Sequence, residues 1–443
     1  MRSIQNNMLL ASESATSLFQ KTARGGYILR GDRTLLCLLA ENRVYQTPTE
    51  LWITHDPHAR AMLRHAAADE AFVEGAGSDF EKFRIFCTVM EQSVGNPLQL
   101  QCHMALRELF DCELLLNETN CEKIWRIVCE TLSCEDLTPC EYVKKCGVDT
   151  VTVPLAPWEL PDDLDRVPEL RVLPVFAPDA YFLPTGKAFS AAVRALDGEI
   201  CDFKSFCKAL LASFDRFAAS GCRVATHGVL PDAFSRPNEY HAALYFEKAL
   251  AGEVLAPNEL ALYQAQLWRV LSQGYAMRDI TMELRVGETP AKNEINHPVS
   301  GVNSVTALKE LLDYLKERVG LPRVAVYAES AAQLLDVAAL AARYPAIIEG
   351  VPQIALGVWQ SAPADVRAQL RALASVAPLS ECLGALPDAR LPYSALSPAL
   401  FHRTLCTELA DWELHGETDS GEEILCRVIA RLTGENMQKY YQL

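Results

Sequence analysis

Short apolar runs that recur along most of the chain constrain its fold more than any other feature. One run lies at residues 26–32, and seven more follow between residues 148 and 386, most of them separated by segments with helical periodicity. Strands covered on both faces are uninterruptedly apolar in this way, which is typical of a buried parallel sheet. The eight runs are GYILRGD, VDTVTV, LRVLPVF, CRVAT, DITMELRV, PRVAVYA, QIALGVW and CLGAL.

Eight strands that mostly alternate with helices predict an α/β fold, the (β/α)₈ TIM barrel. Such a barrel needs about 250 residues, whereas the chain has 443. Much of the surplus lies between the first and second runs, where residues 78–132 carry apolar side chains at the intervals of amphipathic helices. We therefore expect an N-terminal helix and first strand in residues 1–36, a helical insertion subdomain in 37–146, and the remaining barrel with C-terminal helices in 147–443.

The overall charge and the N-terminal residues limit the partners of the protein. A net charge of −16 argues against nucleic acid or an anionic membrane as a partner. A local arginine cluster can still bind a small anion. The first residues, MRSIQNNMLLASESA, lack the apolar core of a signal peptide, and no run is long enough to cross a bilayer. We expect a cytoplasmic protein with a small-molecule ligand.

Four of the fifteen cysteines form a cluster in the sequence, Cys129, Cys134, Cys140 and Cys146. Four, five and five residues separate its members, so it contains no Cys-x-x-Cys pair of the kind that structural zinc sites use. We expect reduced thiols that bind no metal.

Eight further segments are spread from residue 49 to residue 441: TELW, SDFEKF, GNPL, LLLNETNCEKIW, KALAGE, GLPRVAVY, LFHRTLC and NMQKYY. In the sequence, order and spacing of these segments the chain resembles the uronate isomerase family. Members of this family interconvert aldose and ketose hexuronates such as D-glucuronate and D-fructuronate. The resemblance implies an amidohydrolase-type barrel, with a helical insertion after the first strand. It also implies a homo-oligomer and a sugar acid as the small-molecule ligand.

The resemblance also implies a divalent metal, held by histidines at the ends of the first and fifth strands. The matching positions in this chain hold Asp32, Thr34 and Arg285. A guanidinium carries only donors and a permanent positive charge, so Arg285 cannot ligate a cation. We therefore expect no metal and no other cofactor.

Two other family motifs retain polar residues that suit sugar chemistry. The final motif survives in GALPDAR, which keeps Asp388 and Arg390 as catalytic candidates. The resemblance further implies substrate binding by Arg285, by Asp32 and by His227, which is retained in ATH. The alternatives are a structural ion pair for Asp388 and Arg390 and a packed side chain for His227.

Aldose–ketose isomerisation needs a base that moves a proton between adjacent carbons and an electrophile that polarises the carbonyl. Asp388 suits the first role, and Arg285 or Arg390 suits the second. These residues favour a uronate isomerase-like protein with altered or weak activity. The alternative is a catalytically inactive homologue that binds a sugar acid or partners an active isomerase subunit. A third possibility is hydrolysis on the same barrel. The replaced metal ligands argue against hydrolysis as much as against the isomerisation of the family.

Overall fold

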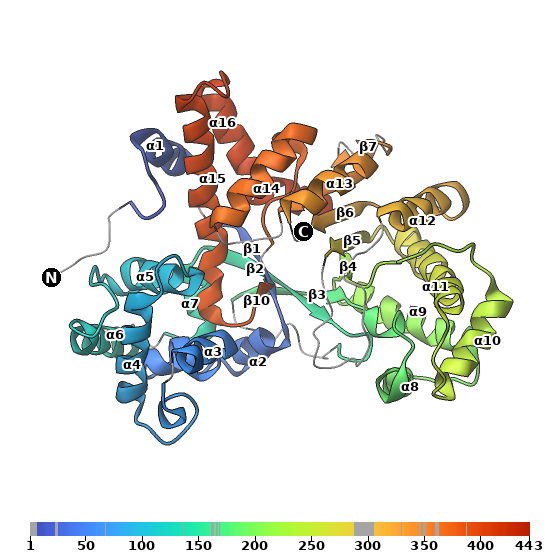
Figure 1. Cartoon of the computed structure of the whole chain (residues 1–443), viewed down its shortest axis with the longest axis horizontal. Helices are drawn as coiled ribbons and strands as arrows, with labels where there is room; N and C mark the ends of the chain where they lie inside the picture. Colours follow the sequence, from blue (N-terminus) through green and yellow to red (C-terminus); the bar gives the residue numbers. More distant parts are fainter. Residues whose placement is uncertain are drawn as a thin grey trace.

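The computed structural model describes residues 7–22, 25–66, 68–135, 137–160, 164, 167, 169–287, 305–328, 330–344, 347–348, 351–358, 363–386 and 388–443. Helices surround a central parallel sheet, as Figure 1 shows. Statements about the structure below refer to these residues.

In the described part of the chain, the central sheet contains eight parallel strands in the order β10-β1-β2-β3-β4-β5-β6-β9. A parallel bridge joins Leu383 to Gly357 on one edge, while Asp388 pairs with Arg30 on the other edge. Two residues only five positions apart therefore contact opposite edges, so the sheet curls as it does in a TIM barrel. The strands are β1 (Tyr27–Gly31), β2 (Val148–Leu155), β3 (Arg171–Phe176), β4 (Val224–His227), β5 (Thr281–Val286), β6 (Val324–Ala328), β9 (Ile354–Val358) and β10 (Asp388–Ala389).

Seven of the predicted runs overlap a strand of this sheet, whereas the strand predicted in the eighth run lies a few residues further along the chain. The run at residues 382–386 contributes a single bridge, and the strand lies at Asp388–Ala389. The C-terminal segment explains the shift. Nδ2 of Asn436 donates a hydrogen bond to the carbonyl of Cys382 at 2.7 Å. A Cβ on Gly384 would lie 1.7 Å from the carbonyl oxygen of Leu432. This stretch is therefore packed against the C-terminal segment. A short antiparallel hairpin, β7 (Ile347–Ile348) and β8 (Val351–Pro352), was not predicted.

Helices fill the sequence between β1 and β2, where amphipathic periodicity predicted them. The Ser78–Glu81 capping box is present, since Ser78 Oγ accepts from the Glu81 amide at 3.3 Å and Glu81 accepts from the Ser78 amide at 3.1 Å. In Figure 1 these helices gather on one side of the sheet. They are α2 (Arg33–Glu41), a π-helix (Glu50–Thr54), α3 (Pro57–His65), a 3₁₀ turn (Glu70–Phe72), α4 (Asp79–Gln92), α5 (Pro97–Phe110), α6 (Cys121–Glu135) and α7 (Pro139–Lys145).

Most of the remaining helices cover the outside of the sheet, and α8 to α14 lie between successive strands of the chain, whereas α17 packs inside. Strand residues that point outward, such as Met282 and Leu284 of β5, belong to the large core shared with these helices. The helices are α1 (Glu13–Lys21), α8 (Gly186–Ala195), α9 (Phe203–Ala219), α10 (Glu239–Leu250), α11 (Pro257–Met277), α12 (Val305–Arg318), α13 (Ala331–Ala341), α14 (Pro363–Val376), α15 (Ser397–Leu414), α16 (Gly421–Ala430) and α17 (Asn436–Tyr441).

A second, smaller core lies inside the curled sheet and includes the end of the chain. Inward residues such as Val224 and Ala325 pack there with Met437, Tyr440 and Tyr441 of α17. The Tyr440 hydroxyl donates to the carbonyls of Val324 at 2.7 Å and Gln353 at 3.1 Å. Since Val324 opens β6 and Gln353 precedes β9, the C-terminal helix closes the interior at the amino ends of the strands.

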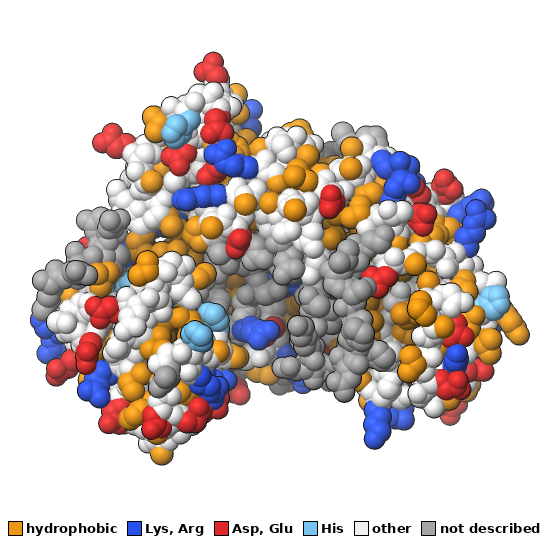
Figure 2. All heavy atoms as spheres, in the orientation of Figure 1, with side chains coloured by type: hydrophobic (Ala, Val, Ile, Leu, Met, Phe, Trp, Pro, Cys, Tyr) orange, Lys and Arg blue, Asp and Glu red, His pale blue; other side chains and the backbone are white. Residues whose placement is uncertain are grey.

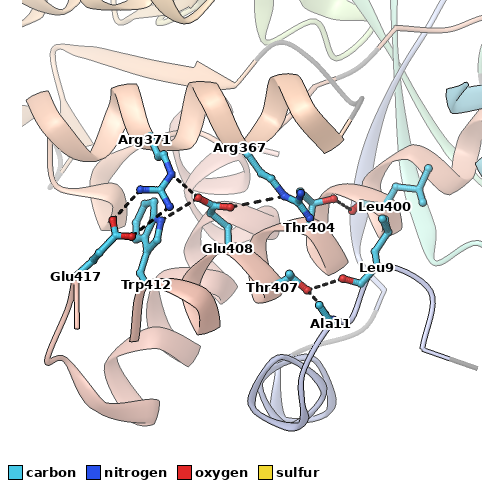
Figure 3. Close-up of polar contacts among 10 residues, drawn as sticks. All are labelled: Leu9, Ala11, Arg367, Arg371, Leu400, Thr404, Thr407, Glu408, Trp412 and Glu417. Carbon is cyan, nitrogen blue, oxygen red and sulfur yellow. Dashed lines mark hydrogen bonds and ion pairs between the residues drawn. The ribbon is translucent and has the colours of Figure 1, made fainter. Parts of the chain in front are cut away.

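A buried carboxylate joins α14 to α15 on the outer layer (Figure 3). Glu408 is 4% exposed and lies 2.7 Å from Nε of Arg371 and 3.6 Å from Nε of Arg367. Nε1 of Trp412 donates to the same carboxylate at 2.9 Å, and Arg371 continues to Glu417 at 2.7 Å. These contacts tie α14 to α15, the helix that follows the segment containing Asp388.

The face of the molecule in Figure 2 carries acidic and basic side chains interspersed over the outer helices. Among the described residues, no helix combines the length and the apolar composition that crossing a bilayer requires. All fifteen cysteines are free thiols. Burial raises the pKa of Cys140 to about 11, so this thiol is protonated at neutral pH.

Gly357 of β9 is required by the ring that lies against it. A Cβ at this position would lie 2.2 Å from Cε1 of Tyr327, a buried residue on the neighbouring strand β6. Because neither strand can move without breaking the ladder, we expect Gly357→Ala to lower the free energy of unfolding by about 2–3 kcal/mol, measured by urea denaturation.

The control is the same substitution in a Tyr327→Leu background, in which the smaller side chain leaves room for the added methyl group. Gly357→Ala should cost clearly less there, and the double-mutant cycle then reports the contact between the two positions. Equal losses in both backgrounds would show that the ring does not set the requirement.

Candidate functional site

The carboxyl ends of β1, β5 and β10 bring together most of the residues predicted to act in the site. In barrels of parallel strands, active sites form at this end of the sheet. Successive residues of a strand point to opposite faces. Met282 and Leu284 of β5 face the helices, so Glu283 and Arg285 face the interior.

An ion pair crosses the interior between β1 and β5. Nη2 of Arg30 lies 2.6 Å from Oε2 of Glu283, and each residue is 1% exposed. Nε of Arg30 also donates to Oγ1 of Thr152 on β2 at 3.1 Å. A buried charge is strongly unfavourable without a partner, so each of the two charges requires the other.

Three further side chains lie in the described surroundings of this pair. Oγ1 of Thr226 donates to Oε1 of Glu283 at 2.8 Å, and the Tyr441 hydroxyl donates to Oε2 at 3.0 Å. The hydroxyls of Tyr441 and Tyr327 are 3.0 Å apart. We call this set the interior polar cluster: Arg30, Thr152, Thr226, Glu283, Tyr327 and Tyr441.

The charge state of the cluster follows from its contacts. Burial by itself would raise the pKa of Glu283. The charges of Arg30 and Arg285, with hydrogen bonds from Thr226 and Arg30, instead hold this pKa below its ordinary value. Burial raises the pKa of Tyr441 well above its ordinary value. At neutral pH the carboxyl group is therefore ionised and the phenol keeps its proton.

Arg285, a predicted substrate-binding residue, lies beside this cluster. It is 8% exposed and is paired in register with Tyr327 of β6. Burial raises the pKa of Tyr327, and the charge of Arg285 counteracts part of that rise. The structure thus places a guanidinium at the inner face of β5, near its carboxyl end.

Asp32 and Arg390 approach each other at the same end of the sheet. Oδ2 of Asp32 lies 3.8 Å from Nε of Arg390, and their side chains are 39% and 69% exposed. Asp32 also caps α2, since its Oδ1 accepts from the amide of Leu35 at 2.9 Å. An exposed pair of this kind adds little stability, so the guanidinium of Arg390 can reorient toward a ligand.

The structure describes the backbone of Asp388, which pairs with that of Arg30 in the sheet.

The segment that follows Asp388 is anchored to the helices between β1 and β2. The hydroxyl of Tyr393 donates to Oδ2 of Asp56, and Oδ1 of Asp56 caps α3 through the amide of His58 at 2.8 Å. Burial raises the pKa of Tyr393, and the charge of Asp56 raises it further. The catalytic role of Asp388 stays a prediction.

The structure does not bring His227 to the other candidate residues. This histidine ends β4, is fully buried and lies on the helix side of the strand. Its Nε2 is 3.1 Å from the Tyr275 hydroxyl, and its Nδ1 is 3.4 Å from Oδ1 of Asp179. The rings of Phe182 and Trp268 pack against it. These are the surroundings of a packed histidine, and substrate binding by His227 remains untested.

The positions at which the resemblance implies metal ligands carry other functions here. Asp32 caps a helix, Thr34 is exposed in the first turn of α2, and Arg285 contributes a guanidinium. Across the described ranges, no three or more His, Cys, Asp and Glu side chains lie close enough together to hold a metal ion.

Sequence reasoning missed Arg30, Glu283 and Tyr441 as members of the site. The signal was present for two of them, since Arg30 and Glu283 are charged residues inside apolar strand runs. A charge on the inner face of a strand must meet a partner across the interior. For Tyr441 the sequence gives no local signal, because its partner lies 158 residues away.

The curled parallel sheet, its outer helices and the charged residues at one end define a TIM-barrel-like protein with a candidate site at the carboxyl ends of its strands. The glucuronate isomerase family model matches residues 1–441, and the chain belongs to this family. It is 25% identical to the uronate isomerase of Caldanaerobacter subterraneus subsp. tengcongensis over 465 residues, covering 99% of this chain and 98% of that protein. Identity to the Bacillus licheniformis uronate isomerase is 26% over 467 residues, covering 99% and 97%.

Solved structures agree on the fold. The uronate isomerase of Thermotoga maritima superimposes with a TM-score of 0.85 at 18% identity, covering 100% of both chains. The glucuronate isomerase of Caulobacter crescentus gives a TM-score of 0.83 at 17% identity, covering 99% of this chain and 97% of that chain. A proposed metal-dependent hydrolase from Lactobacillus casei gives 0.56 at 12% identity, covering 97% of both chains. The chain therefore shares the fold of these solved uronate and glucuronate isomerases.

Glu283→Gln tests the energetic importance of the buried ion pair. The substitution leaves the Arg30 guanidinium buried without its anion, so we expect a loss of about 3–5 kcal/mol in the free energy of unfolding at pH 7. Because the pKa of Glu283 is lowered on folding from its ordinary value of 4.5, its contribution is present above that pH and lost as pH falls through the lower folded value. Urea denaturation at several pH values should therefore show that the difference in unfolding free energy between wild type and Glu283→Gln becomes smaller in acid.

The matched control is Glu422→Gln, which removes the same charge from an exposed pair with Lys21. Its effect should stay small at pH 7 because exposed pairs contribute little. If the stability loss of Glu283→Gln relative to wild type were the same at neutral and acid pH, the assigned charge state would be contradicted.

Proposed function

We propose that this chain is a uronate isomerase-like protein that acts on hexuronates such as D-glucuronate and D-fructuronate, with altered or weak activity. Family membership over nearly the whole length supports the substrate class. The buried guanidinium of Arg285 on the inner face of β5 supports the altered chemistry. This guanidinium is the observation that carries the proposal.

The residues at the implied ligand positions do not fit a divalent cation. A catalytic metal needs imidazoles or carboxylates with free lone pairs, and a position open to substrate. Arg285 has no lone pair to offer and repels a cation, while the carboxylate of Asp32 is engaged by the amino end of α2. We infer that the protein works without a resident metal or other cofactor.

Without a metal, charge on the sugar must be stabilised by arginine. Asp388 is the proposed base that moves a proton between the adjacent carbons, and Arg390 stabilises the oxyanion that develops on the enediolate. Arg285 binds the substrate, since guanidinium groups form strong charge-assisted hydrogen bonds with carboxylates. Asp32, 3.8 Å from Arg390, orients that guanidinium when the site is empty.

The same inference extends to the architecture. We take the curled sheet to be a complete (β/α)₈ barrel, with the helices between β1 and β2 as an insertion subdomain over residues 37–146. Residues 1–36 would then supply the N-terminal helix and first strand, and 147–443 the rest of the barrel. A cytoplasmic homo-oligomer is the assembly that the family resemblance implies.

The decisive measurement is the conversion of D-glucuronate and D-galacturonate by purified protein, with and without added Zn²⁺ or Mn²⁺. We expect slow turnover that added metal does not increase. Asp388→Asn should lower it about a hundredfold or more, because a general base contributes at least that much. The control Asp419→Asn removes an exposed carboxylate before α16 and should leave turnover unchanged.

Rapid conversion together with one tightly bound metal per chain, measured by elemental analysis, would reject the proposal in favour of the ordinary family chemistry. An absence of turnover combined with thermal stabilisation by a hexuronate would instead identify an inactive sugar-acid-binding homologue.

A further inference from the structure

Two of the eight segments in which the chain resembles its family have no part in the proposed function. TELW runs into the π-helix Glu50–Thr54, and SDFEKF opens α4. The two segments meet, since Oγ1 of Thr49 donates to the carbonyl of Asp79 at 2.6 Å and Oγ1 of Thr47 donates to Oδ2 of Asp79 at 3.1 Å. A cavity lies beside this junction, among the helices between β1 and β2.

The cavity has a volume of about 240 Å³. Its walls come from the π-helix, from α3 through Arg60, from the segment after the 3₁₀ turn through Glu74, and from α4 through Lys82. Figure 1 shows α3 and α4 in this part of the molecule. Pockets for drug-sized ligands measure about 300–1,000 Å³, so this cavity suits a smaller group.

Lys82 is the charged side chain of the cavity that has no partner. It is half-buried, and in the part of the chain that the structure describes its ammonium group makes no hydrogen bond or ion pair. An ammonium group carries three donors, and a charge that is partly removed from water needs a counter-charge. An anion inside the cavity would supply both acceptors and charge.

The second cation of the cavity, Arg60, has a carboxylate partner that it shares. Nη1 of Arg60 lies 2.5 Å from Oε1 of Glu74, while Oε2 of Glu74 lies 2.7 Å from Nη2 of Arg64. Nε of Arg60 is buried and has no hydrogen-bond partner among the described residues. Glu74 therefore divides its charge between two guanidinium groups and leaves part of the donor capacity of Arg60 unused.

The balance of charge favours an anionic ligand. Two cations and one carboxylate line the cavity, so its walls carry one positive charge. Arg64 and Glu70, which pair at 2.6 Å behind this wall, leave the balance unchanged. A local positive excess is notable in a chain whose net charge is −16, because most of its surface repels anions.

The hydroxyls of the cavity indicate which anion fits. Oγ1 of Thr49 donates to the carbonyl of Asp79, and Oγ1 of Thr54 donates to the carbonyl of Thr49 at 3.2 Å. Their protons are therefore already committed, and the donors left for a ligand belong to the cations. Attraction to such groups grows with the charge of the ligand, so a phosphate group of nearly −2 fits better than a carboxylate of −1.

We propose that the cavity between the π-helix, α3 and α4 binds a phosphate group, held by Lys82 and Arg60. The phosphate would replace part of the contact between Arg60 and Glu74 and would bridge three helical elements. Free phosphate and the phosphate of a small metabolite share this chemistry. The inference does not depend on the proposed function, because it concerns other residues and no sugar acid.

Calorimetric titration with inorganic phosphate at constant ionic strength tests the site. Lys82→Gln removes the unpaired cation, and we expect it to weaken binding about tenfold or more, as expected for losing a charge-assisted hydrogen bond. The matched control Lys204→Gln removes an exposed lysine from α9 and should change affinity less than about twofold. Lys82→Arg keeps the charge and should restore most of the affinity. Equal affinity of wild type and Lys82→Gln, or no saturable binding to wild type, would overturn the proposal.

Glu74→Gln tests the balance of charge in the opposite direction. It removes the carboxylate that competes for Arg60, so we expect phosphate to bind several-fold more tightly. Unchanged or weaker binding would overturn the proposal, as would acetate binding as tightly as phosphate. D-glucose 6-phosphate distinguishes the two sources of the ligand. Tighter binding than inorganic phosphate would identify a phosphorylated metabolite, and equal or weaker binding would identify free phosphate.

Hydrogen exchange locates the bound ion. Phosphate should slow amide exchange in peptides that cover the π-helix and the first turns of α3 and α4, in wild type but not in Lys82→Gln. Phosphate salts also stabilise folded proteins in general, because they are excluded from protein surfaces. Slowing that is spread evenly over the chain and is equal in the two proteins would reflect this general effect and overturn the proposal.

Discussion

The buried ion pair between Arg30 and Glu283 is the interaction on which the rest of the structure depends. Three strands separate β1 from β5 in the sheet order. In a flat sheet with strands about 4.8 Å apart, the backbones of the two residues would be about 19 Å apart. The 2.6 Å contact between their side-chain atoms forms because the sheet curls and brings opposite strands face to face. Curvature and charge pairing are therefore mutually dependent. The curl gives each buried charge its partner, and an open sheet would leave both charges unpaired in an apolar interior.

This pairing also shapes the charge on the inner face of β5. Glu283, which is paired with Arg30, and Arg285 lie two residues apart on that face. A guanidinium carries only donors and a positive charge, so it cannot ligate a metal ion. In an enzyme that uses a metal, the ion polarises the substrate carbonyl and organises water. An arginine can supply charge and orientation, but it cannot activate water as a Lewis acid does. The proposed slow or altered activity would follow from such an exchange on an inherited scaffold.

The sequence predicted the local features of this fold more successfully than the contacts across it. Apolar runs identified seven strands because each run is a local property of the chain, and the Ser78–Glu81 capping box is equally local. The side of a strand on which a residue lies is decided by register, and a shift of one residue reverses it. His227 illustrates this point, since it ends β4 as predicted but faces the helices. Asp32 illustrates a second limit, because one carboxylate at a strand end can cap the next helix or face a ligand.

The interior polar cluster shows why the centre of the molecule was hardest to predict. Its members come from positions 30, 152, 226, 283, 327 and 441, so no short stretch of sequence contains two of them. Contacts of such long sequence separation form late in folding, because the loops between them must be closed first. The cluster is therefore complete only after the C-terminal helix has docked. The docking of the C-terminal helix and the order of the interior polar cluster are therefore coupled through one carboxylate, that of Glu283.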